Sequence, residues 1–176
     1  MELNIIKEAR DKFGSPLYIF DLDKLKERVM MIKERVKSAQ CCYAMKANPF
    51  LIKPMNEYVD KYEVCSPGEY EICHRMGIAP EKIVVSGVNK THESMDRIMK
   101  LSGGKGIFTI ESEEHYDILS KVCAEQQTDI KVIIRLSSGN QFGVDKDMFE
   151  RIASEIARDE HLELYGLHYY SGTQKK

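Results

Sequence analysis

The sequence predicts an α/β fold with a parallel sheet, because short apolar runs alternate with amphipathic segments along most of the chain. Helical periodicity is present first at 3–13 and 22–36, with a turn and a short strand expected between them at 14–21. Six further strands are expected at 41–45, 63–65, 83–85, 106–110, 130–136 and 162–168. The helices expected between these strands cover 51–59, 68–76, 91–101, 112–123 and 147–157.

Two architectures share this alternation, the open doubly wound sheet and the closed (β/α)8 TIM barrel. Polar, glycine-containing segments follow several of the strands, and a barrel gathers such loops around one mouth. No GxGxxG motif follows the first strand, which weakens the dinucleotide-binding alternative. We therefore predict a TIM barrel, incomplete at about six βα units. Because an unclosed barrel leaves sheet edges unpaired, we expect residues 1–176 to be the N-terminal portion of a barrel domain that is truncated at Lys176.

The composition is that of an ordinary globular domain, with 43% hydrophobic and 31% charged residues. The 26 basic and 28 acidic residues are interspersed and give a net charge of -2, so no footprint for nucleic acid or for an anionic membrane is present. A small molecule is the expected partner. The charged first residues do not resemble a signal peptide, and no run approaches the ~20 apolar residues of a membrane span. We expect a cytoplasmic protein.

The five cysteines and five histidines do not form the spacings of a zinc site or an HExxH pair. We therefore expect no metal site. Several cysteines stand in apolar runs, so most should be reduced and buried as small hydrophobic residues.

Lys46 directly follows the first apolar strand, and Pro49 prevents an immediate helix. This position places an amine at the predicted barrel mouth. A partly desolvated lysine can lose its proton, attack an aldehyde and form a Schiff base. From the residue alone, a solvated lysine at the end of a strand is the commoner case.

The context of Lys46, residues 43–49, resembles the cofactor-lysine motif of the fold-type III pyridoxal-phosphate decarboxylases, which include diaminopimelate, ornithine and arginine decarboxylases. Seven further segments resemble the same family in the same order: 14–21, 62–70, 86–90, 110–112, 132–135, 141–143 and 166–174. The resemblance implies a barrel of the alanine racemase/decarboxylase type, pyridoxal 5'-phosphate as cofactor and a homodimer. It also implies decarboxylation of an amino acid, with meso-diaminopimelate to L-lysine as the leading expectation.

Site residues follow from the resemblance position by position. Lys46 would be the catalytic residue that forms the Schiff base with the cofactor. Glu63 would supply a carboxylate near Lys46, and Arg135 would lie near the cofactor ring. Since a buried unpaired guanidinium is costly, Arg135 should have a charged partner. Gly172 and Thr173 would bind the cofactor phosphate through backbone amides and a hydroxyl.

Two departures from the family pattern bear on the reaction. Tyr170 stands where the family usually has a histidine that stacks on the pyridine, and His168 lies two residues earlier. We count both as cofactor-binding, although a tyrosine ring carries no positive charge. Gln141 replaces the lysine of the family's Lys-Phe-Gly, so the ion pair that this lysine often makes across the dimer is not expected.

Other functions compatible with the Lys46 motif are an ornithine- or arginine-type decarboxylase, a racemase and a pyridoxal-phosphate carrier. A racemase would be expected to show a Tyr-Gly pair after Lys46-Ala47, where this chain has Asn48-Pro49-Phe50. A carrier would share the strand that bears Lys46, but the motifs at 66–69 and 172–174 resemble decarboxylases better. In the family, other cofactor contacts come from later segments, some of them in the partner subunit, so we expect this chain alone to bind the cofactor weakly and to turn over little. We also expect the family's C-terminal β domain to be absent from this chain.

Overall fold

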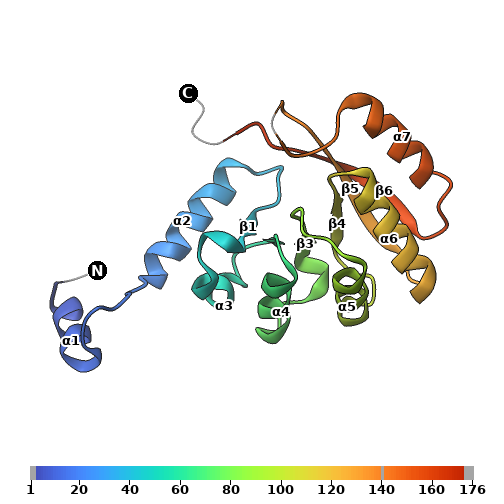
Figure 1. Ribbon diagram of the computed structural model, residues 1–176. Helices are drawn as coiled ribbons and strands as arrows, with labels where there is room; N and C mark the ends of the chain where they lie inside the picture. Colours follow the sequence, from blue (N-terminus) through green and yellow to red (C-terminus); the bar gives the residue numbers. More distant parts are fainter. Residues whose placement is uncertain (1–2, 140, 173–176) are drawn as a thin grey trace.

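The computed structural model describes residues 3–139 and 141–172 (Figure 1). Two helices, α1 (Leu3–Phe13) and α2 (Leu22–Arg35), precede the sheet. The strands are β1 (Cys42–Ala44), β2 (Lys61–Val64), β3 (Ile83–Val85), β4 (Ile107–Ile110), β5 (Ile130–Leu136) and β6 (Leu162–Tyr169). The helices between them are α3 (Ile52–Met55), α4 (Pro67–Arg75), α5 (His92–Ser102), α6 (Glu113–Gln126) and α7 (Lys146–Ile156). Short 3-10 turns cover Met45–Ala47, Pro49–Leu51 and Pro80–Lys82.

The strands form one parallel sheet in the order β1-β2-β3-β4-β5-β6. Each strand pairs with the next one along the chain, whereas the strand order of a doubly wound sheet reverses at a switch point. Helices α3 to α7 form a curved row along one side of the strands (Figure 1). This is the arrangement of a TIM barrel, so the predicted fold class is confirmed for the six described strands and the five helices that connect them.

Four of the connecting helices begin at a side chain that accepts a hydrogen bond from the backbone amide three residues later. Such caps satisfy amide groups that the first turn of a helix leaves unpaired. The capping residues are Ser66, Thr91, Ser112 and Asp145. Because each cap fixes where a loop ends and a helix begins, the caps also fix the loops at the mouth of the barrel.

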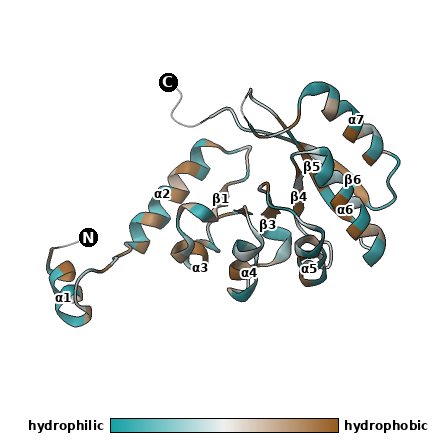
Figure 2. Cartoon of the chain, viewed as in Figure 1, coloured by the Kyte–Doolittle hydropathy of each residue, from teal (hydrophilic) through white to brown (hydrophobic). Residues whose placement is uncertain are grey.

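The core is built mainly from the strands and the helix faces that cover them. All four residues of β4 are buried, and Phe108 and Ile110 are inaccessible to solvent. Apolar residues concentrate along the central strands, while the helices show mixed faces (Figure 2). Strand β6 instead exposes Leu164 and Leu167, and no described strand pairs with its outer edge.

Two local predictions were wrong. Residues 14–21 form no strand, because no described strand lies beside them to pair with their backbone groups. The helix expected at 51–59 is reduced to α3, which ends at Met55. After Met55 the chain continues as a turn, in which the Asn56 and Tyr58 amides bond to carbonyl groups three residues earlier.

The prediction for the cysteines also needs correction, because only Cys73 and Cys123 are buried. Cys41 and Cys65 are partly exposed and Cys42 is exposed, since they lie at the ends of short strands rather than within the core. Within the described residues no helix is long and apolar enough to cross a membrane.

Phe108 should be among the most stabilising side chains. Replacing it with alanine leaves a cavity in the core, and we expect a loss of about 3–5 kcal/mol in the free energy of unfolding, measured by urea denaturation. Phe13→Ala is the matched control, because Phe13 is 72% exposed and its loss should change stability by no more than about 0.5 kcal/mol. Similar losses for both variants would contradict the assignment of the core.

Candidate active site

A cavity of about 780 Å³ opens at the carboxyl ends of the strands. Its volume lies within the range of about 300–1,000 Å³ that is typical of small-molecule sites. Carboxyl ends of parallel barrel strands are also where active sites of this fold lie. The lining residues are Cys42, Ala44, Lys46, Glu63, Cys65, Val84, Ser86, Gly87, Val88, Thr109, Glu111, Ile133, Arg135, Phe142, His168 and Tyr170.

Lys46 lies in the 3-10 turn that directly follows β1, at the open side of the cavity. Its Nζ atom is 3.7 Å from Glu63 Oε2 and 3.4 Å from Cys65 Sγ, and its side chain is 59% exposed. Desolvation lowers the pKa of Lys46, but Glu63 and Cys65 outweigh this effect, so the net pKa is raised. Desolvation thus favours the neutral amine, as expected, but the neighbouring Glu63 carboxylate stabilises the protonated amine more strongly.

Glu63 is held at this position by the strand after its own. The Ser86 hydroxyl donates a hydrogen bond of 2.8 Å to Glu63 Oε1, and Ser86 immediately follows β3. Glu63 pairs in register with Ala44 of β1 and Val84 of β3, so the sheet itself brings the carboxylate beside Lys46. The register of β1 and β2 therefore places the Glu63 carboxylate close to Lys46.

The Ser66-Pro67-Gly68-Glu69 motif fixes the end of β2. Ser66 caps α4 by accepting a hydrogen bond from the Glu69 amide, and Glu69 Oε2 accepts one from the Cys65 amide at 2.7 Å. The reciprocal contacts are those of a capping box displaced by one residue. The motif thus has a structural reason, which is to hold Cys65 at the cavity wall next to Lys46.

Arg135 and Glu111 form a buried ion pair on the cavity wall. Arg135 Nη1 donates to Glu111 Oε2 at 2.9 Å, and the two side chains are 15% and 2% exposed. The expectation of a charged partner for Arg135 is confirmed. The Gly87 amide donates to the other oxygen, Glu111 Oε1, at 3.0 Å. Both carboxylate oxygens are therefore satisfied, as a buried charge requires.

Two aromatic rings flank the Arg135 guanidinium. The ring centres of Phe142 and Tyr170 lie 5.2 and 5.9 Å from its central carbon. Gly143 has a φ of +85°, and a Cβ there would lie 2.8 Å from the Arg135 carbonyl oxygen. The glycine lets the loop fold back so closely that the Val144 amide bonds to that same oxygen, which brings Phe142 to the cavity.

The pairing of β5 with β6 shifts register between Val132 and Ile133. Beyond this irregularity Arg135 stands opposite His168. A one-residue change of register would turn the β6 side chains to the other face of the sheet. The shift therefore determines that His168 lies beside Arg135 in the cavity.

His168 is partly buried, and its Nδ1 atom has no hydrogen-bond partner among the described residues. Burial lowers the pKa of His168, and the charge of Arg135 lowers it further. The imidazole is therefore neutral near pH 7. An unsatisfied buried nitrogen in a cavity is a polar group that a bound molecule can reach or shield.

The structure gathers five of the predicted site residues around this cavity: Lys46, Glu63, Arg135, His168 and Tyr170. Gly172 follows β6 with a φ of +108° and is not among the lining residues. Thr173 lies outside the described residues, so its predicted contact with phosphate stays a prediction.

Sequence reasoning assigned no role to several side chains that build the site. Glu111 and Ser86 contact predicted residues directly, and Lys90, in the loop that follows β3, is buried. A signal for them was available, because all three fall within segments 86–90 and 110–112. Charged or polar residues that follow apolar strands directly were the feature that could have predicted these site residues.

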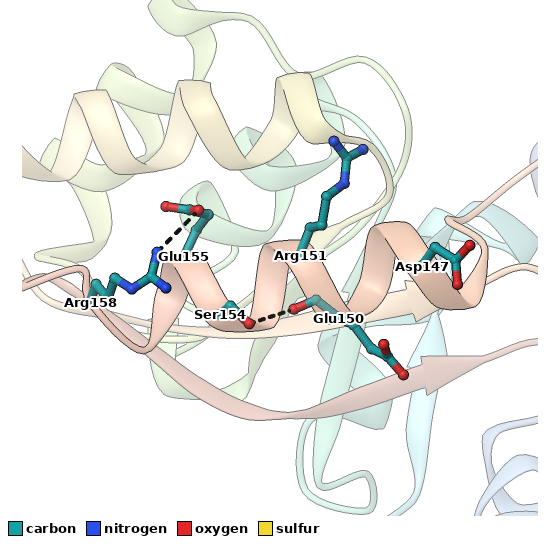
Figure 3. Close-up of a pocket in the computed structure, with 6 residues that line it drawn as sticks. All are labelled: Asp147, Glu150, Arg151, Ser154, Glu155 and Arg158. Carbon is teal, nitrogen blue, oxygen red and sulfur yellow. Dashed lines mark hydrogen bonds and ion pairs between the residues drawn. The ribbon is translucent and has the colours of Figure 1, made fainter.

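A second hollow lies over the outer face of α7 and is lined by one helical stretch (Figure 3). Arg158 pairs with Glu155 at 3.5 Å, and Arg151 and Glu150 pair with Glu113 and Lys146 outside the hollow. The Ser154 hydroxyl donates to the Glu150 carbonyl. Exposed pairs of this kind are ordinary surface features. Among the described residues, no group of three or more His, Cys, Asp or Glu side chains is arranged to hold a metal ion.

A parallel barrel with a lysine at the opening of its cavity is typical of a cofactor-binding domain. Comparison with known families identifies which family this domain belongs to. The model of the family "Pyridoxal-dependent decarboxylase, pyridoxal binding domain" matches residues 22–176. The chain belongs to this family, and pyridoxal phosphate is its cofactor.

Curated relatives include diaminopimelate decarboxylases of Aquifex aeolicus and Campylobacter jejuni, at 29% and 28% identity. Both alignments cover 96% of this chain, but only 44% and 46% of those relatives, so the chain spans less than half their length. A crystal structure of Helicobacter pylori diaminopimelate decarboxylase complexed with L-lysine has a TM-score of 0.85 at 22% identity, over 96% of this chain and 47% of that one. At this identity the likeness shows the fold.

The residues present fit pyridoxal phosphate. Lys46 offers a primary amine for the aldehyde, and Tyr170 offers an aromatic face beside the aliphatic Ile133 for the ring. Arg135 offers a fixed positive charge for an anionic group. The unsatisfied Nδ1 of His168 agrees with a site that a ligand completes.

Glu111→Gln tests the buried pair. Removing the charge leaves Arg135 buried without a partner ion, and we expect a loss of about 3–5 kcal/mol in the free energy of unfolding. Glu113→Gln is the control, because Glu113 faces Arg151 at 3.7 Å with both side chains more than half exposed and should cost less than about 1 kcal/mol. Chemical denaturation of both variants gives the comparison, and equal losses would show that the Arg135 pair is not desolvated.

Proposed function

We propose that this chain supplies the cofactor-binding part of a pyridoxal-phosphate-dependent amino-acid decarboxylase, in which Lys46 holds the cofactor covalently. The single observation that carries the proposal is the position of Lys46. Its amine lies at the mouth of a barrel cavity, 3.7 Å from the Glu63 carboxylate and across from the Arg135–Glu111 pair. Family membership supports the same chemistry.

Pyridoxal phosphate supplies an aldehyde that joins an amine, and a ring that accepts the electron pair left when carbon dioxide departs. Lys46 must lose a proton before its Nζ atom can attack the aldehyde. Glu63 Oε2 is the nearest carboxylate oxygen to that proton, at 3.7 Å. The Ser86 hydroxyl occupies the other oxygen, Oε1, and so keeps Oε2 turned toward Lys46.

The opposite side of the cavity would orient the ring. Tyr170 lies where its face can stack on an aromatic ring, and the Arg135 guanidinium beside it is immobilised by Glu111. Val84, Val88 and Ile133 add apolar wall that excludes water from the reacting centre. Neutral His168 can offer a hydrogen bond without adding a further charge.

We further propose meso-diaminopimelate as the substrate and L-lysine as the product. The support is that the similar curated proteins are named diaminopimelate decarboxylases. We also propose that residues 1–176 belong to a barrel domain of a longer decarboxylase. The homodimer implied by the family resemblance stays a prediction.

Lys46→Ala tests the covalent attachment. Incubation of the product of the complete gene with pyridoxal phosphate and borohydride should label the peptide that contains Lys46, detected by mass spectrometry after proteolysis. Lys46→Ala should lose this label, because no other lysine lines the described cavity. Lys53→Ala, an exposed lysine on α3, should keep it. A label spread over many surface lysines, and unchanged in Lys46→Ala, would refute the role of Lys46.

The substrate is tested separately by release of carbon dioxide from the product of the complete gene. We expect meso-diaminopimelate to react with a higher kcat/KM than L-ornithine, L-arginine or L-lysine, with L-lysine as the product. A preference for ornithine or arginine would retain the decarboxylase proposal and reject its substrate. Racemisation without carbon dioxide release from any of the four would reject the decarboxylase.

A further inference from the structure

The side chain of Lys90 is a buried cation that the proposed mechanism does not use. Lys90 precedes the cap of α5, is only 6% exposed and is not among the residues that line the cavity. Its Nζ atom donates to the Gly87 carbonyl oxygen and, at 3.3 Å, to Thr109 Oγ1. Burying an ammonium group costs desolvation free energy, so a buried lysine is expected to have a structural or functional role.

Both acceptors of Lys90 belong to the immediate surroundings of Glu111. The Gly87 amide donates to Glu111 Oε1 at 3.0 Å, and the Thr109 hydroxyl lies 3.4 Å from the same oxygen. Gly87 has a φ of +88°, and a Cβ there would lie 2.2 Å from the Cys65 carbonyl oxygen. Gly87 is therefore packed against Cys65, with its carbonyl group bonded to Lys90 of the same loop and its amide group bonded to Glu111.

The charges extend this arrangement to the cavity wall. Burial lowers the pKa of Lys90 to about 8, Glu111 and Cys65 act against this change, and Arg135 adds to it. Glu111 thus interacts with two cations. One is Lys90 in the loop after β3, and the other is Arg135 at the cavity, whose Nη1 atom lies 2.9 Å from Glu111 Oε2. His115 also faces this cluster, and the Lys90 charge contributes to lowering its pKa.

We propose that Lys90 is a positioning residue for the cofactor site, which fixes Gly87 and Thr109 so that Glu111 holds the Arg135 guanidinium in place beside Tyr170. This inference rests on the proposed function, because it concerns the orientation of pyridoxal phosphate. Lys90 acts through Glu111 and does not contact the cavity itself. Its removal should loosen Arg135 without removing the amine at Lys46.

Lys90→Met tests the proposal, because it keeps an unbranched apolar stem and removes the three donors. We expect the dissociation constant for pyridoxal phosphate, measured by absorbance titration, to rise about tenfold. The visible circular dichroism of the bound cofactor should also change, because this signal reports how the ring is oriented. Trapping at Lys46 with borohydride at saturating cofactor should persist. Lys121→Met, an exposed lysine on α6, should match the wild-type chain in every measurement.

A second measurement separates positioning from a general effect on folding. If Lys90 acts through Glu111, Lys90→Met should weaken binding little further when Glu111→Gln is already present, whereas independent structural damage would multiply the two effects. Thermal unfolding confirms that each variant is folded at the temperature of the titration. If Lys90→Met does not fold, Thr109→Val removes one of the contacts without stranding a charge, and it should alter the circular dichroism in the same sense.

The outcomes distinguish the two proposals. If the wild-type product of the complete gene forms no adduct at Lys46, both the proposed function and the role of Lys90 are wrong. A wild-type chain that binds the cofactor, beside a folded Lys90→Met or Thr109→Val variant with the same dissociation constant and the same circular dichroism, would defeat only the role of Lys90. Multiplicative effects of Lys90→Met and Glu111→Gln would defeat it as well.

Discussion

The ion pair between Arg135 and Glu111 is the interaction on which the site depends. Both side chains are withdrawn from water, so either charge is strongly destabilising at this position without the other. The pair also joins separate parts of the sheet, because Glu111 follows β4 and Arg135 lies near the end of β5. Whatever holds Glu111 therefore also determines where a positive charge stands on the cavity wall.

The two sides of the cavity differ in their access to solvent, and this difference matches two different tasks. Lys46 and Glu63 lie on the more exposed side, where a proton can be exchanged and a substrate can enter. Arg135 and Glu111 lie on the dry side, where charges interact more strongly and reorient less. A reactive amine needs access, whereas a group that orients a ring needs rigidity.

Rigidity on the dry side is built from backbone as much as from side chains. Gly87 and Gly143 adopt positive φ angles at points where a Cβ would collide with neighbouring carbonyl oxygens. The loops after β3 and β5 consequently pack closely against adjacent strands, and their side chains reach the cavity with little freedom. The proposed role of Lys90 adds to this rigidity, since its buried ammonium group bonds the loop after β3 to Thr109 of β4.

The sequence by itself determined the class of fold, since the alternation of apolar and amphipathic segments is local and repeats six times. It also determined the candidate lysine and the residue types of its neighbours, because Lys46, Glu63 and Arg135 each lie in or directly after an expected strand that carries a family motif. It did not determine the partner of Arg135, although the cost of a buried guanidinium required one.

Only the tertiary structure decided that Glu111 is this partner, that the net pKa of Lys46 is raised, and that His168 faces the same cavity as Arg135. Residues 14–21 show the same limit, because their extended pattern does not reveal whether a strand lies beside them. Distances between elements depend on strand register, and one register shift between β5 and β6 sets the face on which His168 lies. Local sequence specifies which residues can form a strand, but pairing across the sheet fixes which side chains meet.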